Sequence, residues 1–96
     1  MPNLVIVSMT VKKGFVDDAV AVLKEIVDRM KEADGCLSVQ LVEDVVHPEK
    51  FKIYEKWDSL DKQKDFTKYL QTEGLFSKLK ETLNEGPSAE TYSTNS

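Results

Sequence analysis

The stretch FKIYEKW, residues 51–57, alternates between two kinds of side chain and so predicts a β-strand with one buried face. The apolar side carries Phe51, Ile53 and Trp57, and the other side carries Lys52, Tyr54 and Lys56. Glu55 breaks this pattern, because it falls on the apolar side, where a carboxylate that leaves water without a partner loses its solvation. Either that face is not a dry core, or Glu55 has a partner or a chemical task.

Outward from this strand, the spacing of apolar residues predicts the remaining elements. Strand patterns cover residues 4–11 and 36–46, the latter with Leu37, Val39 and Leu41 on one side; a helical stripe covers 15–30, weaker helical patterns cover 61–70 and 75–83, and a short edge strand falls near 89–93. The order is β-α-β-β-α-β, the pattern of ferredoxin-like α+β folds with a four-stranded antiparallel sheet. Residues 1–96 then form one domain, with a core over about 4–92 and a polar tail at 93–96.

Right-handed crossovers place both helical segments on the same face of that sheet, which leaves the other face uncovered. The first strand is apolar on both sides, and Tyr54 points toward the uncovered face. A large apolar patch on a soluble protein is usually a contact surface. We therefore expect a homodimer whose sheets pack face to face, with Tyr54 in the interface. The alternative is a tolerated patch that Lys52 and Lys56 partly shield.

Composition narrows the classes of function. The 96 residues carry a net charge of −4, and of the 13 basic residues all but Arg29 are lysines, so we expect no nucleic-acid partner. A single cysteine and a single histidine allow no internal disulfide and no Cys/His zinc site within one chain. The first residues lack the features of a signal peptide, and their apolar run is too short to span a bilayer. We expect a cytoplasmic protein with no membrane partner.

Three stretches together resemble the antibiotic biosynthesis monooxygenase family of small dimeric α+β barrels, and in particular its quinol monooxygenases. They are GCLSVQL (35–41), FKIYEKW followed by a helix, and GPSAETY (86–92). The resemblance covers about residues 4–92, and the most diagnostic part is the Phe-x-x-Tyr-Glu-x-Trp pattern that begins at Phe51.

The resemblance implies a pocket between sheet and helices in which a small electron-rich aromatic, such as a quinol, phenol or anthrone, reacts with O₂. It implies no cofactor and no metal, because the deprotonated substrate supplies the electron. The polar residues of two branches are missing: the haem-degrading branch has an asparagine near Val7 and a histidine near Phe66 or Thr67, and the aromatic-polyketide branch has an asparagine where Ile53 stands. The alternatives are therefore a non-enzymatic dimer that binds a small molecule, or an isomerase on the same fold.

Two residues are candidates for catalysis. Trp57 would form a pocket wall that stacks on a flat substrate, or is simply a large core residue. Glu55 would have a raised pKa and take a phenolic proton, or is paired structurally. The residues expected to bind substrate are Val7, Phe51, Ile53, Phe66 and Tyr69. Of these, Phe66 and Tyr69 lie on the weaker helix, where they would close the pocket or pack in the core.

Overall fold

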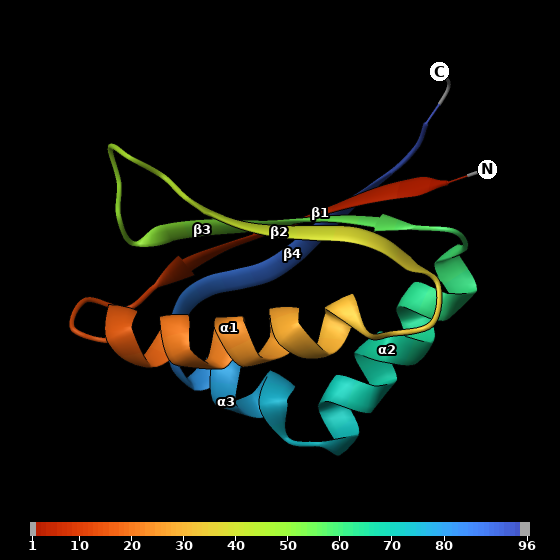
Figure 1. Ribbon diagram of the computed structural model, residues 1–96. Coiled ribbons are helices and arrows are strands. Elements are labelled where there is room, and N and C mark those ends of the chain that lie inside the picture. The colour runs from red at the N-terminus through yellow and green to blue at the C-terminus, as the bar shows by residue number, and fades with distance from the viewer. Residues whose placement is uncertain (1, 95–96) are drawn as a thin grey trace.

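The computed structural model describes residues 2–94 and has the predicted order of elements (Figure 1). The elements are β1 (Asn3–Val11), α1 (Val16–Lys31), β2 (Cys36–Glu43), β3 (Lys50–Trp57), α2 (Leu60–Thr72), α3 (Leu75–Glu81) and β4 (Leu83–Ser93). The strands form one antiparallel sheet in the order β2-β3-β1-β4, and all three helices cover the same face of it. The predicted ferredoxin-like α+β fold is confirmed.

The core lies between the helices and the covered face of the sheet. In β3 every second residue is buried, from Phe51 through Ile53 and Glu55 to Trp57, and the residues between them are exposed. The apolar stripe of α1 packs against this face with Ala19, Leu23, Ile26, Val27 and Met30 buried. The two periods that predicted these elements, 2 for the strand and 3.6 for the helix, therefore also predicted which side chains form the core.

The second helical region is divided into two helices, α2 and α3. The hydroxyl oxygen of Ser59 accepts a hydrogen bond from the N–H of Lys62 at 3.4 Å and caps α2. Gly74 then adopts φ +76°, a left-handed conformation that glycine tolerates best, and α3 begins directly after it. Because of this break, α2 and α3 are separate helices on the same side of the sheet.

Two expectations about strands were wrong in detail. β4 begins at Leu83 and not near residue 89. It is a long edge strand that is held by backbone pairing with β1, and most of its side chains are exposed. Such a strand shows no apolar alternation. In β2, Leu37 does not share a side with the buried positions: a register shift between Cys36 and Ser38 leaves it 55% exposed.

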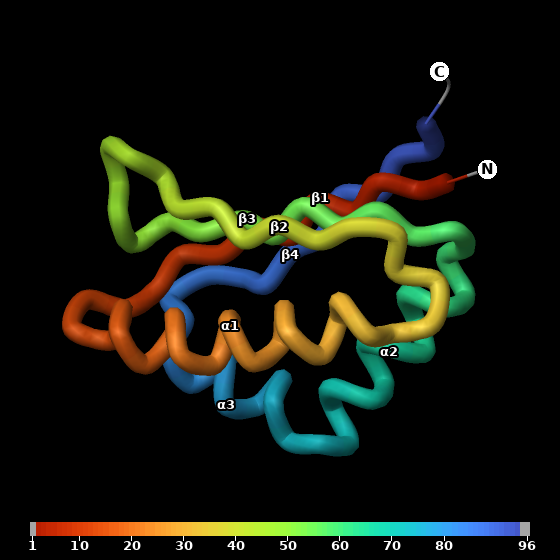
Figure 2. Tube along the Cα trace, viewed as in Figure 1, coloured from red at the N-terminus to blue at the C-terminus, as the bar shows by residue number. Residues whose placement is uncertain are grey.

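The uncovered face of the sheet carries a mixed surface. Ile6 of β1 pairs with Tyr54 of β3 on one side and with Glu90 of β4 on the other, and Leu4 pairs with Tyr92. Tyr54 and Tyr92 are exposed, whereas Leu4 and Ile6 are half-buried. Figure 2 shows the two described ends of the chain side by side at one end of this sheet, where the N–H of Thr94 donates to the carbonyl of Pro2 at 3.2 Å.

Candidate functional site

Glu55 lies in the middle of the covered face, with an apolar neighbour on each adjacent strand. Its partner on β1 is Val5 and its partner on β2 is Val39. The Glu55 residue is only 3% exposed. Its Oε1 accepts a hydrogen bond of 2.8 Å from the indole Nε1–H of Trp57, two residues along the same strand and hence on the same face. The carboxyl on the apolar side of the strand therefore has a partner, and that partner is the tryptophan.

Burial controls the ionisation of this carboxyl. Removal from water disfavours the charged form and raises the pKa of Glu55 from 4.5 to about 7, although the Trp57 hydrogen bond favours the carboxylate and lowers the pKa in part. Protonated and ionised forms are therefore both populated near neutral pH. Burial raises the pKa of the nearby Cys36 thiol, and the Glu55 charge raises this pKa further, which disfavours a thiolate beside the site.

A cavity of about 70 Å³ lies beside Glu55, between the sheet and the three helices. Four residues predicted from the sequence line it: Val7, Ile53, Glu55 and Phe66. Among the described residues of its lining, Glu55 alone is ionisable, and the only other hydrogen-bonding side chains are Gln63 and Thr67 of α2. The other lining residues, which are apolar, are Met9, Ile26, Met30, Leu70, Phe76, Leu79 and Pro87. The cavity is thus small and mostly apolar, and Glu55 is the one ionisable group among its described lining residues.

Trp57, the second catalytic candidate, stands behind the cavity wall. It is fully buried, and its ring centroid is 5.8 Å from that of Phe66, which does line the cavity. Its contact with the site is thus made through Glu55 and Phe66. This geometry suits a residue that holds the carboxyl in place better than one that stacks directly on a ligand.

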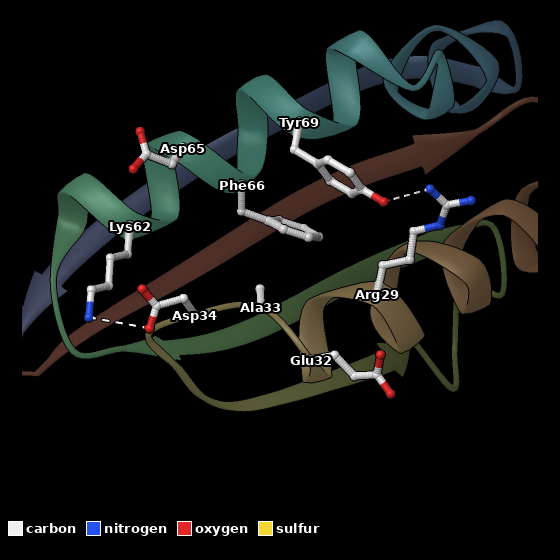
Figure 3. A pocket seen from close by; sticks show the side chains of 8 residues that line it. All are labelled: Arg29, Glu32, Ala33, Asp34, Lys62, Asp65, Phe66 and Tyr69. Carbon is white, nitrogen blue, oxygen red and sulfur yellow. Dashed lines mark hydrogen bonds and ion pairs between the residues drawn. The ribbon is translucent and has the colours of Figure 1, made fainter.

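Phe51 and Tyr69 were also expected to bind substrate, but the structure places both outside the cavity lining. Phe51 is two residues before Ile53 and is buried, and one strand residue spans about 3.3 Å, so its side chain lies well along the strand from Ile53. Tyr69 is 41% exposed and lines a separate groove of about 410 Å³ between the end of α1 and α2 (Figure 3). The alternation of β3 gave the face on which Phe51 lies but not the position of the cavity along that face.

Charged side chains hold the two sides of that groove together. Nη1 of Arg29 donates to the hydroxyl of Tyr69 at 2.8 Å and to Oε1 of Glu73 at 2.9 Å, which ties α1 to the end of α2. At the other end of the groove, Nζ of Lys62 lies 3.5 Å from Oδ1 of Asp34 (Figure 3). Phe66 extends from α2 between these two ties.

The sequence profile of the antibiotic biosynthesis monooxygenase family matches residues 2–75. The chain belongs to this family. Among curated protein sequences, none matches it significantly.

Solved structures with the same fold are numerous. A conserved protein from Methanosarcina mazei superimposes with a TM-score of 0.90 at 17% identity, over 99% of this chain and 94% of that one. A candidate antibiotic biosynthesis monooxygenase from Bordetella bronchiseptica gives 0.82 at 20% identity, over 98% and 97%. One from Caulobacter crescentus gives 0.85 at 20% identity, over 99% and 91%. At these low identities, the similarity to the three structures shows that the chain shares their fold.

Gln63 and Thr67 are the site residues that the sequence analysis missed. Together with Phe66 and Leu70 they follow i, i+3, i+4, i+7 spacing and so share one face of α2. Within this pair, Nε2 of Gln63 donates to Oγ1 of Thr67 at 3.2 Å. A search for apolar stripes alone passes over them, but the face was already marked by Phe66 and Leu70.

In residues 2–94, no helix has both the length and the apolar character needed to cross a membrane. The same residues include no group of three or more His, Cys, Asp or Glu side chains placed to hold a metal ion.

Proposed function

We propose that this protein is a cofactor-independent monooxygenase that oxidises a small electron-rich aromatic of the quinol, phenol or anthrone type with O₂. The observation that carries the proposal is Glu55: one buried carboxyl with a pKa of about 7, facing a cavity that is apolar apart from Glu55, Gln63 and Thr67. A general base works best when its pKa lies near the operating pH. Family membership and fold agree with this chemistry.

In the proposed reaction, the Glu55 carboxylate takes the phenolic proton of the substrate. The phenolate gives one electron to O₂, and the resulting phenoxyl radical and superoxide combine at a ring carbon to form a peroxide. Glu55 returns its proton to the peroxide, and the ring carbon that bears the peroxide loses its C–H proton as the O–O bond breaks. One oxygen atom thus becomes a quinone oxygen, and the other leaves with the two protons as water. A phenol and O₂ thus give a quinone and water, with all four electrons supplied by the substrate. The same carboxyl acts first as base and then as acid, which requires a pKa near neutrality.

Trp57 acts as a positioning residue in this proposal. Its indole N–H fixes one oxygen of Glu55 at 2.8 Å and leaves the other oxygen to face the substrate. The apolar walls keep water away from the phenolate, which strengthens every electrostatic interaction in the cavity.

Homodimer formation is also part of the proposal. The uncovered face combines apolar side chains with charges of both signs, since Ile6 lies between Tyr54 and Glu90 while Lys52 and Lys56 flank Tyr54. A two-fold axis through such a surface can bring lysines of one copy toward Glu90 of the other.

At micromolar concentration, sedimentation equilibrium is expected to give about twice the chain mass of 10.9 kDa. Tyr54→Lys, which adds a third positive charge to the centre of the face, is expected to shift the protein to monomer. A wild-type protein that sediments as a single chain would remove the dimer from the account.

A non-enzymatic binding protein is the second candidate, because Glu55 already has a structural partner in Trp57 and no other ionisable group among residues 2–94 lines the cavity. Such a protein would bind an aromatic and release it unchanged.

Oxygen uptake separates the two candidates. Metal-free wild-type protein, kept in chelator, is expected to consume O₂ with hydroquinone and to produce a hydroxylated quinone faster than a heat-denatured sample, which controls for autoxidation. Saturable binding with hydroquinone recovered unchanged would favour the binding protein. Conversion of an aromatic ligand to an isomer without O₂ would indicate an isomerase.

A further inference from the structure

Phe66 lies between two separate spaces in the molecule. Its ring lines the cavity beside Glu55, and the same ring lines the outer groove between α1 and α2. Among the described residues that line either space, Phe66 is the only one that lines both. Figure 3 shows its side chain reaching from α2 into the region between Tyr69 and Ala33. This ring is therefore the partition between the cavity and the groove.

The two spaces differ greatly in size. The cavity measures about 70 Å³ and the groove about 410 Å³. An apolar cavity of about 150 Å³ holds one benzene ring. The cavity beside Glu55 is too small for any aromatic substrate unless one of its walls moves.

Of the residues that line the cavity, Phe66 has the groove on its other side and so has space to move into. On the sheet side, Ile53 belongs to a central strand, and Glu55 is fixed by Trp57. On the helix side, Leu70 and Leu79 line the cavity but not the groove. The Phe66 ring contacts the rings of Trp57 and Tyr69 at centroid distances of 5.8 and 5.7 Å, and both contacts are tilted. Rotation toward the groove would break these two ring contacts and would leave the backbone of α2 in place.

Such a rotation would let a substrate ring take the place of the Phe66 ring in the cavity. When the Phe66 ring leaves the cavity side, it frees about its own volume, which suits a single six-membered ring. We infer that Phe66 is the specificity-determining residue of this site and that the substrate class is single-ring phenols and hydroquinones, with three-ring anthrones excluded. The inference rests on the proposed function and narrows it.

Binding in the absence of O₂ tests this inference without requiring turnover. Calorimetric titrations with hydroquinone and with 1,8-dihydroxyanthrone give a ratio of the two dissociation constants for each variant. In the wild type this ratio is expected to favour hydroquinone. Phe66→Ala joins the cavity to the groove and is expected to shift the ratio at least tenfold toward the three-ring ligand, comparable with known effects of small volume changes in apolar pockets.

Leu70→Ala is the matched control. Leu70 lies one turn further along α2, is 7% exposed like Phe66, and lines the cavity but not the groove. Its truncation enlarges the cavity without joining it to the groove, so the ratio is expected to change less than threefold. Phe66→Leu, a milder change, is expected to shift the ratio in the same direction as Phe66→Ala and serves in its place should circular dichroism show Phe66→Ala unfolded.

An unchanged ratio in the folded Phe66 variant, or an equal shift in Leu70→Ala, would overturn the inference. The proposed function fails separately: size-selective binding that depends on Phe66, without O₂ consumption in air, would leave the inference standing and remove the oxygenase. Turnover in air with a ratio that does not depend on Phe66 would do the opposite.

Discussion

Replacing Glu55 by glutamine is expected to lower kcat/KM for hydroquinone by about 100- to 10,000-fold, the usual contribution of a positioned general base. Glutamine keeps the size of the side chain and can still accept the Trp57 hydrogen bond through its amide oxygen, so the cavity should keep its shape. What it loses is the ability to take the phenolic proton. Steady-state oxygen consumption measures the loss. Glu43→Gln, at an exposed position of β2, is the matched control and is expected to retain wild-type activity.

The pH profile distinguishes this role from a structural one. Because the carboxylate is the active form, kcat/KM of the wild type should rise with pH and level off above a pKa of about 7. Since the Trp57 hydrogen bond lowers that pKa, Trp57→Phe is expected to move the midpoint upward while leaving an apolar ring in place. Retention of wild-type kcat/KM by Glu55→Gln, or a profile whose midpoint is the same in Trp57→Phe, would contradict the proposed role.

The second large effect is on stability. The pKa of Glu55 is raised in the folded state from 4.5 to about 7, so the folded protein favours the protonated carboxyl. Below pH 4.5 both folded and unfolded chains hold the proton. Between pH 4.5 and 7 the unfolded chain releases it first, and the free energy of unfolding falls by about 1.4 kcal/mol per pH unit. The stability linked to Glu55 is thus present at low pH and lost as pH rises, in total roughly 3 kcal/mol, or about 10 to 20 °C in Tm for a domain of this size.

Chemical unfolding of wild type and Glu55→Gln at pH 4.5 and pH 8 isolates this contribution, because all other titrating groups are shared. From pH 4.5 to pH 8, the free energy of unfolding of the wild type is expected to fall by roughly 3 kcal/mol relative to that of Glu55→Gln. Protein concentration must be equal in each series, since dimer formation would also contribute to stability. Glu43→Gln should show no such difference from the wild type. Parallel curves for wild type and Glu55→Gln would mean that Glu55 titrates as an ordinary surface carboxyl.

Much of the fold was predictable because its central elements have periodic patterns. The alternation of β3 placed Glu55 on the covered face, and the stripe of α1 predicted the helix that covers it. β4 was largely missed, since its position depends on backbone hydrogen bonds that leave no side-chain pattern. Gly86 is one local sign of it: this residue has φ +88°, and a Cβ there would lie 2.7 Å from the carbonyl oxygen of Ser8.

The site was predictable in part for a similar reason. Periodicity gives the face on which a residue lies, and Val7, Ile53 and Phe66 do line the same cavity as Glu55. It does not give the depth of a cavity along that face, which is why Phe51 and Tyr69 were expected in it as well.

The central claim is that the buried Glu55 carboxyl gains and loses its proton near neutral pH, and ¹³C NMR of side-chain-labelled glutamate measures this directly. One carboxyl resonance, absent from the spectrum of Glu55→Gln, is expected to titrate with a midpoint of about 7. A Glu55 resonance that titrates near 4.5 would contradict the account.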